Sequence, residues 1–234
     1  MKYFIGMKTS VTVAETCISQ GVVMTDAAIL ARDACHDPAG GWFGRHDGAL
    51  CAESVPLARI AAAVGTPFYA YSAAALRAGY AALSQAVAPH GAEVCFAVKA
   101  NGNTHVLAEF ARMGAGMDIV SGGEMVRALA AGTPADRIIF SGVGKTGDEI
   151  RAALRAGLSQ INVESPAELE VVAAVAREMG LRAPVALRVN PDVDALTHAK
   201  ITTARKDSKF GIAIADIPAL YAAAAARPEL RVVG

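Results

Sequence analysis

The sequence has few cysteines, no long hydrophobic run and no excess of either charge. Its cysteines (Cys17, Cys35, Cys51 and Cys95) form no CxxC pair, so neither a disulfide framework nor a zinc site is indicated, and we expect reduced thiols in a cytoplasmic protein. The longest apolar runs, such as 217–226, fall well short of the roughly 20 residues that a membrane-spanning helix needs. With 22 basic and 22 acidic residues, the composition argues against nucleic acid as the main partner.

Nucleotide and metal motifs are incomplete as well. SGVGKTGDE (141–149) looks like a phosphate-binding loop, but that pattern needs a glycine where Ile139 stands, so a turn that caps a helix is the better interpretation. In NPDVDALTH, Asp192 and Asp194 lack the glycine and the distal glutamate of a calcium-binding EF-hand loop. His198 has no second histidine near it. We therefore predict no metal site.

The start of the chain gives little indication of a fold. The apolar patch in MKYFIGMKTS ends at Lys8 and is too short for the apolar region of a signal peptide. A second methionine, Met24, suggests that residues 1–23 are an upstream extension of a chain that begins later. We expect 1–64 to be a lead-in, in which DPAGGWFGRHDGAL is only a glycine-rich approach to the first helix, and 65–234 to be the folded domain.

From Gly65 onward, short apolar segments that predict strands alternate with segments that predict helices. Ser72 is a good N-cap for the alanine-rich helix that follows it, and Ser121 with Glu124 has the spacing of a capping box, so a helix should begin directly after the strand before it. The segments that predict strands are TPFYAYS (66–72), EVCFAVK (93–99), MDIV (117–120), RIIFSG (137–142), SQINVES (159–165), PVALRVNPD (184–192) and LRVVG (230–234).

Alternating strands and helices of this kind form a parallel sheet, either doubly wound or closed into a (β/α)8 barrel. No GxGxxG follows any strand, which disfavours a dinucleotide-binding sheet. Polar residues collect after strand ends, at Lys99, Ser121, Ser141, Glu164 and Asn190, and in a barrel these ends form the face that carries the chemistry. We therefore predict an α/β barrel. Counting from EVCFAVK gives five strands and a sixth that begins as the chain stops, so we expect a barrel truncated after about six strands.

In EVCFAVKANGN, an apolar run ends on Lys99 and a small polar turn follows. A lysine in this place is either a surface residue that reaches solvent or a group placed for chemistry, and this stretch alone does not decide between the two. An amine held among apolar residues loses solvation of its charged form and becomes a usable nucleophile toward an aldehyde.

Five segments together resemble one family. FAVKANGN, GMDIVSGGE, FSGVGKT, LRVNPDVDALTH and SKFGI occur in this order, and at close to this spacing, in diaminopimelate decarboxylases. These belong to the alanine-racemase-like, fold-type III enzymes that use pyridoxal 5'-phosphate (PLP). The resemblance covers 65–234, and it implies a (β/α)8 barrel followed by a β domain that is absent from this sequence.

The resemblance also implies an activity and a set of residues. The activity is PLP-dependent decarboxylation of meso-2,6-diaminopimelate to L-lysine, the last step of lysine biosynthesis, by a homodimer. Lys99 is implied to be the lysine that forms a Schiff base with PLP, Asp118 the acid beside Lys99 and the cofactor, and Arg188 a basic residue below the ring on a neighbouring strand. The loop 198–210 resembles a flap near the substrate. Taken without the resemblance, the basic residues of this loop are typical of a loop exposed to solvent.

The elements that the family carries later, including its phosphate anchor, are not in this sequence, so the chain as given is expected to be an incomplete fragment. Two other functions stay open. One is a related decarboxylase acting on ornithine, arginine or carboxynorspermidine, which share SKFGI. The other is a non-catalytic PLP carrier made of a single barrel, which would be expected to complete eight strands.

Overall fold

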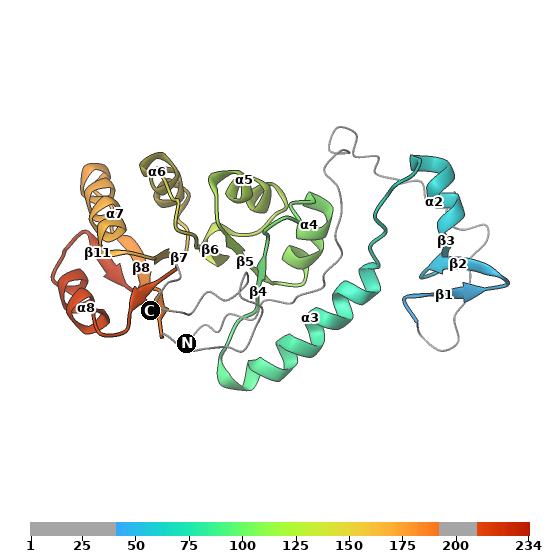
Figure 1. Ribbon diagram of the computed structural model, residues 1–234, viewed down its shortest axis with the longest axis horizontal. Coiled ribbons are helices and arrows are strands. Elements are labelled where there is room, and N and C mark those ends of the chain that lie inside the picture. Colours follow the sequence, from blue (N-terminus) through green and yellow to red (C-terminus); the bar gives the residue numbers. More distant parts are fainter. Residues whose placement is uncertain (1–40, 192–209) are drawn as a thin grey trace. The chain divides into compact units, whose positions relative to one another are not determined.

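The computed structural model describes residues 41–191 and 210–234 (Figure 1). The expected upstream extension, Asp192, Asp194, His198 and nearly all of the expected flap lie outside these ranges. No helix within them combines the length and the hydrophobicity needed to cross a lipid bilayer. Contacts divide the described residues into two compact units, one that ends at Leu83 and one that begins at Ser84. The division falls inside a helix, whereas the sequence analysis divides the chain at 64 and 65.

The first unit contains a small antiparallel sheet that the sequence analysis missed. Its strands are β1 (Phe43–His46), β2 (Ala49–Ala52) and β3 (Val55–Pro56), and helix α2 (Leu57–Val64) follows directly. Asp47 and Gly48 join β1 to β2 with positive φ angles of 49° and 81°. An Asp-Gly pair suits such a two-residue hairpin turn, because both positions need a left-handed backbone. This pair was the signal that the glycine-rich segment is a hairpin.

The strand predicted at TPFYAYS (66–72) is wrong. These residues form no strand, and in the described part of the chain no strand pairs with them. Tyr69 and Tyr71 are instead exposed and stack on each other, with ring centroids 6.3 Å apart. Alternating apolar residues give a strand-like pattern, but a strand needs a neighbour that accepts its backbone hydrogen bonds.

Helix α3 (Ala73–Val87) begins where the sequence predicts. The Ser72 hydroxyl oxygen accepts a hydrogen bond from the Ala75 N–H at 3.0 Å, as an N-cap does. Ser72 also donates to Glu53 Oε1 at 2.7 Å, and the same oxygen accepts from the Ala74 N–H at 2.9 Å. These hydrogen bonds lower the pKa of Glu53. The predicted cap is confirmed, and the carboxylate of Glu53 accepts a further backbone N–H at the start of the same helix.

The second unit is built on six parallel strands, in the order β11-β8-β7-β6-β5-β4. Neighbours in this sheet are also neighbours along the sheet-forming sequence, with no reversal of strand order of the kind that marks a doubly wound fold. Five strands and a sixth at the end were predicted, and this is what the structure contains. Their bounds are β4 (Cys95–Ala97), β5 (Gly116–Ile119), β6 (Ile138–Phe140), β7 (Gln160–Val163), β8 (Ala183–Leu187) and β11 (Leu230–Val232).

Helices α4 to α7 form a row along one face of this sheet (Figure 1). Four of the helices begin at a polar N-cap whose side chain accepts a backbone N–H, at Asn103, Ser121, Thr146 and Ser165. The helices are α4 (Thr104–Arg112), α5 (Gly122–Ala130), α6 (Gly147–Ala156), α7 (Pro166–Met179) and α8 (Ile217–Ala225). The remaining elements are the 3-10 turns η1 (Ala88–His90) and η2 (Ala135–Arg137), and the short parallel pair β9 (Val189–Asn190) and β10 (Ile212–Ala213).

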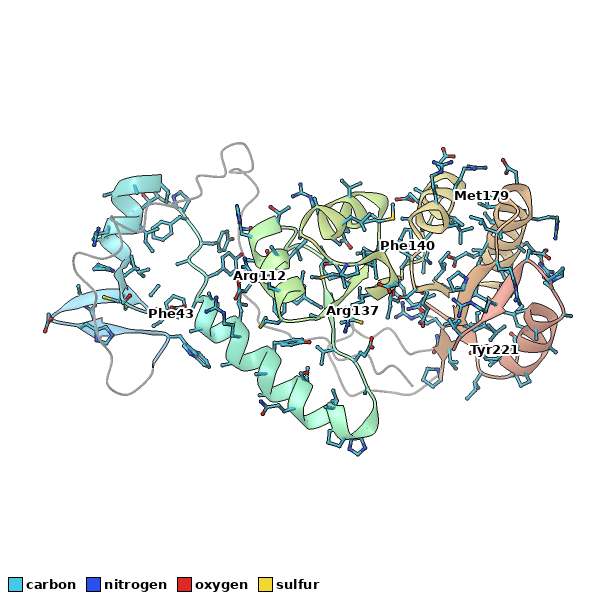
Figure 2. All side chains as sticks on the ribbon, turned by 180° about the vertical axis from the view of Figure 1, so that it is seen from behind. Phe43, Arg112, Arg137, Phe140, Met179 and Tyr221 are labelled. Carbon is cyan, nitrogen blue, oxygen red and sulfur yellow. The ribbon has the colours of Figure 1, made fainter. Side chains whose placement is uncertain are left out.

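The hydrophobic core fixes which side chains of each strand face away from the helices. Ile161 and Val163 of β7 are fully buried in the cluster that α6, α7 and α8 cover. Phe96 of β4 stacks on Phe110 of α4, with ring centroids 4.1 Å apart. Figure 2 shows Phe140 of β6 among the side chains that fill the space between sheet and helices. Because side chains alternate along a strand, the residues between these apolar positions point to the opposite face.

Candidate functional site

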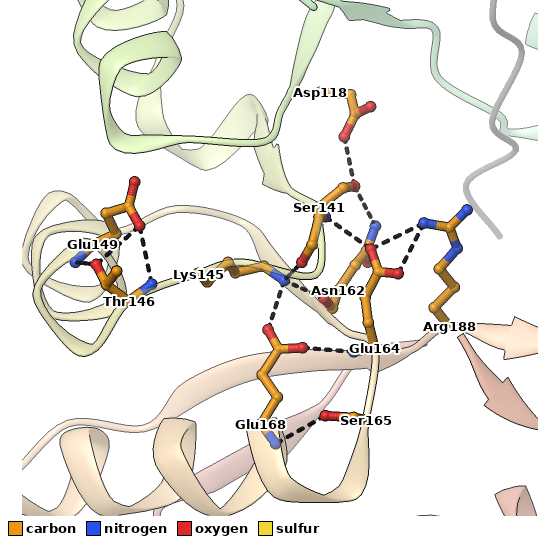
Figure 3. Close-up of polar contacts among 11 residues, drawn as sticks. Asp118, Ser141, Lys145, Thr146, Glu149, Asn162, Glu164, Ser165, Glu168 and Arg188 are labelled. Carbon is orange, nitrogen blue, oxygen red and sulfur yellow. Dashed lines mark hydrogen bonds and ion pairs between the residues drawn. The ribbon is translucent and has the colours of Figure 1, made fainter. Parts of the chain in front are cut away.

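The alternation of side chains brings polar residues of five strands to one face, at their carboxyl ends. Lys99 follows β4 and Asp118 lies in β5, each separated by an even number of positions from residues that face away from the helices. Ser141 directly follows β6, and Asn162 lies in β7. Arg188 directly follows β8. Figure 3 shows Asp118, Ser141, Asn162 and Arg188 directed toward a common region. This is the end of a parallel barrel sheet at which active sites form.

Lys99 lies in the turn after β4 and has a left-handed backbone, with φ of 46°. Its Nζ donates to Asp118 Oδ2 at 3.4 Å. Directly before it, the Val98 N–H donates to the Asp118 carbonyl oxygen at 3.0 Å, which ties this end of β4 to β5. A non-glycine residue with positive φ carries backbone strain, which is frequent at functional positions.

The structure does not hold the Lys99 side chain among apolar residues: 52% of it is exposed, while Asp118 is fully buried. The reason is its position. Lys99 stands two residues past Ala97, the last residue of β4, where the backbone has left the sheet. The amine is therefore open to a ligand from solvent and fixed to the protein by one carboxylate.

Asp118 is buried, and each of its carboxylate oxygens has a partner. Oδ2 faces the Lys99 amine, and Oδ1 accepts a hydrogen bond from the Ser141 hydroxyl at 2.6 Å. Burial raises the pKa of Asp118 above its ordinary value, and the hydrogen bond from Ser141 and the charges of Lys99 and Arg188 oppose that rise. These partners supply what a carboxylate needs in order to stay ionised without water.

Arg188 is on the same face but is held by a different acid. Its Nη1 donates to both carboxylate oxygens of Glu164, at 3.0 and 2.9 Å, and its guanidinium lies over the Phe210 ring at 5.2 Å. The Glu164 side chain is only 2% exposed, whereas that of Arg188 is 37% exposed. The sequence marked Glu164 as a polar residue at a strand end without identifying it as the partner of Arg188. Glu164 and Arg188 are both separated by an even number of positions from side chains that face away from the helices. This alternation was the signal in the sequence that both side chains lie on one face.

Carboxylates at helix starts connect the loops of this face to one another. Glu149 completes a capping box with Thr146, and its Oε1 accepts from the N–H of Gly122, the first residue of α5, at 2.7 Å. Glu164 Oε1 accepts from the Gly142 N–H at 2.8 Å. At Ser121 only half of the predicted box forms, because the carboxylate of Glu124 reaches the Val120 N–H and not that of Ser121. The start of α5 is as predicted.

Lys145 lies at the centre of this connection, and its side chain is fully buried. Its Nζ donates to the carbonyl oxygens of Gly142 and Asn162, at 2.5 and 2.8 Å, and to Glu168 Oε1 at 2.6 Å. All three donors of the ammonium group are used, as Figure 3 shows. The segment SGVGKTGDE is therefore the helix-capping turn that its sequence predicts, and its lysine joins two loops.

The residues on this face suit a ligand that carries an aldehyde. Lys99 offers a primary amine that is half exposed, and Asp118 can hold a proton at that amine. Arg188 and Glu164 add a fixed pair of charges on the same face. An amine that condenses with an aldehyde needs both access and a neighbouring acid, and the pair Lys99 and Asp118 meets both needs.

The chain matches the family described as "Pyridoxal-dependent decarboxylase, pyridoxal binding domain" over residues 73–234. It is 54% identical over 192 residues to a diaminopimelate decarboxylase of Pseudomonas aeruginosa, a match that covers 82% of this chain and 46% of the relative. The chain thus spans about half the length of the curated relatives it matches.

Solved structures give the same likeness. Diaminopimelate decarboxylase from M. jannaschii, in complex with L-lysine, superposes with a TM-score of 0.75 at 32% identity, over 82% of this chain and 46% of that one. An arginine decarboxylase of Paramecium bursaria Chlorella virus reaches a TM-score of 0.59 at 21% identity, over 76% of this chain and 46% of that one, which shows a shared fold alone.

Proposed function

The chain belongs to the pyridoxal-dependent decarboxylases, and on that premise we propose that it is the pyridoxal-binding part of an enzyme that decarboxylates meso-2,6-diaminopimelate to L-lysine. The observation that carries the proposal is the contact between the half-exposed Lys99 amine and the buried Asp118 carboxylate, 3.4 Å apart at the carboxyl ends of the strands.

In this proposal Lys99 would hold the cofactor through its Nζ, and Asp118, which accepts a hydrogen bond from that nitrogen, would help to keep it protonated. Arg188 presents a positive charge, and its position is fixed by one guanidinium nitrogen that donates to both carboxylate oxygens of Glu164. When bound, PLP supplies an electron sink for the charge left by the departing carboxylate. The protein's part is to place the amino acid against that sink and to deliver a proton afterwards.

The choice of substrate rests on the relatives. Those 42–54% identical to this chain are named diaminopimelate decarboxylases, whereas the likeness to the viral arginine decarboxylase concerns the fold. We further propose that the whole protein is a homodimer that works in the cytoplasm. The resemblance to the family supports the dimer, and the absence of any CxxC pair in the sequence supports the compartment.

A spectral titration tests the proposal. PLP added to the purified chain is expected to give the absorbance band of a lysine-bound pyridoxal, and the Lys99→Arg variant, which keeps the charge, is expected to lose it. In the whole protein, addition of meso-diaminopimelate is expected to change the band at lower concentration than L-ornithine or L-arginine does. Equal responses to the three amino acids would refute the choice of substrate, and a band that persists in Lys99→Arg would refute the site.

A further inference from the structure

A line of four polar side chains crosses three strands and ends at the acid beside Lys99. Gln160 Nε2 donates to Asn162 Oδ1 at 2.6 Å, Asn162 Nδ2 donates to Ser141 Oγ at 2.9 Å, and Ser141 Oγ donates to Asp118 Oδ1 at 2.6 Å. Figure 3 shows the two links that involve Ser141. In the sequence, Ser141 is recognisable only as a polar residue at a strand end, and nothing singles out Asn162.

This line has one direction, and the chemistry of the groups imposes it. The amide of Gln160 donates to Asn162, so the carbonyl oxygen of Asn162 faces Gln160 and its NH2 group faces Ser141. Because Ser141 already accepts a hydrogen bond from that NH2 group, its own hydrogen is free to point at Asp118. An ionised carboxylate can only accept hydrogen bonds, so the donor order along this line stabilises the charged form of Asp118.

Burial makes the hydrogen bond that Asp118 accepts from Ser141 important for the charge of Asp118. Asp118 is fully buried and Ser141 is 8% exposed, so water does not replace the hydrogen bond between these two residues. A hydrogen bond to a charged group in such surroundings contributes more than one between neutral groups. Asp118 thus has two distinct sides, with Oδ1 turned to Ser141 and Oδ2 turned to the amine.

We propose that Ser141 and Asn162 are positioning residues that hold the Asp118 carboxylate charged and turned toward Lys99. This rests on the proposed function, since it is the PLP-binding amine that the carboxylate serves. Ser141 acts directly on Asp118, and Asn162 acts through Ser141. The hydrogen bond of the Lys99 amine goes to Asp118 and to neither of these residues, so their effect on the cofactor site passes through the orientation and the charge of Asp118.

Other charged groups near Asp118 act alongside this line. Lys99 and Arg188 favour the charged carboxylate. Burial raises the pKa of Glu124, at the start of α5, and the charge of Asp118 adds to that rise. Burial itself is the largest influence on Asp118 and favours its neutral form. Ser141 is the leading influence that opposes burial, so its removal should be visible in the titration of Asp118.

The test is a carbon-13 NMR titration of the Asp118 carboxyl group in the 234-residue chain without cofactor, with the signal assigned through Asp118→Asn. Ser141→Ala removes a donor to the charged form, so the pKa of Asp118 is expected to rise by about one unit, a tenfold gain in proton affinity. Asn162→Ala is expected to raise it less, and the double variant to match Ser141→Ala, because Asn162 acts through Ser141.

Two further variants separate this role from packing. Ser141→Thr keeps the hydroxyl and is expected to restore the titration. Ser159→Ala, whose hydroxyl donates to the Ile138 carbonyl oxygen at 2.7 Å, removes a comparable serine hydrogen bond elsewhere and is expected to leave Asp118 unchanged. If Ser141→Ala does not fold, Asn162→Ala alone decides the matter.

An Asp118 titration that stays unchanged in Ser141→Ala and Asn162→Ala overturns the inference, even where these variants unfold at lower temperature. Shifts in the two single variants that add in the double variant also overturn it. Because this titration needs no PLP, its result is independent of the spectral test of the proposed function, and failure of one is distinguishable from failure of the other.

Discussion

Replacement of Lys145 by methionine should be among the most destabilising changes on the functional face. The ammonium group is fully buried and joins the carbonyl oxygens of Gly142 and Asn162 to the carboxylate of Glu168, whose side chain is 11% exposed. Methionine fills a similar volume, so the loss is chiefly electrostatic. It leaves a nearly buried carboxylate without its cation and two carbonyl groups without donors.

The expected size follows from these contacts. Removal of one partner of a buried ion pair typically costs about 3–5 kcal/mol, because the remaining charge has neither water nor a counterion. We therefore expect Lys145→Met to lower the free energy of unfolding by about 3 kcal/mol or more. The double variant Lys145→Met/Glu168→Gln removes the orphaned charge, while the glutamine oxygen can still accept from the Glu164 N–H as Glu168 does at 2.8 Å. It should recover a large part of the loss.

Urea unfolding followed by circular dichroism measures both variants, with the free energy taken from the midpoint and the slope. Arg151→Met is the matched control, because Arg151, whose side chain is 30% exposed, pairs with Asp148 and Glu178, which are 98% and 65% exposed, and such exposed pairs should contribute little. A loss in Lys145→Met no larger than in Arg151→Met would refute the reasoning, as would a double variant no more stable than the single one.

Two further changes have expected outcomes that the same unfolding measurements check. Gly116→Ala places a Cβ 2.7 Å from the Arg137 carbonyl oxygen and should cost about 1–3 kcal/mol, whereas Gly147→Ala meets nothing nearer than 4.0 Å and should be tolerated; equal stabilities would contradict this. The pKa of Glu149 lies below its ordinary value of 4.5, chiefly because the carboxylate accepts from the Gly122 N–H. Its stabilisation is therefore complete above pH 4.5 and lost as the pH falls through the lowered pKa, so the stability difference between the wild type and Glu149→Gln should shrink in acid, and a constant difference would contradict the assignment.

The sequence was sufficient for the parts of the fold that local patterns determine. The six strands of the parallel sheet and the helix starts at Ser72 and Ser121 follow from apolar runs and capping residues, which act over a few positions. The contact between Lys99 and Asp118 was expected from the resemblance to the family, and the pairing of β4 with β5 explains it, because adjacent parallel strands bring their carboxyl ends together.

What the sequence did not predict depends on partners that are distant along the chain. TPFYAYS has the pattern of a strand, but it has no neighbour in the described residues, and pattern alone does not supply one. Arg188 and Glu164 belong to different strands, and only the packed sheet shows that they form an ion pair. The exposure of Lys99 likewise depends on where β4 ends, a detail finer than the apolar run can indicate.

The most direct test of the account is to find which lysine binds the cofactor. The chain is incubated with PLP, reduced with borohydride and digested, and the labelled peptides are identified by mass spectrometry. The account predicts a label on Lys99, whose amine is accessible, and none on Lys145, whose side chain is fully buried and fully hydrogen bonded. Labelling spread over several lysines, or no label on Lys99, would contradict the assignment of this face as the PLP site.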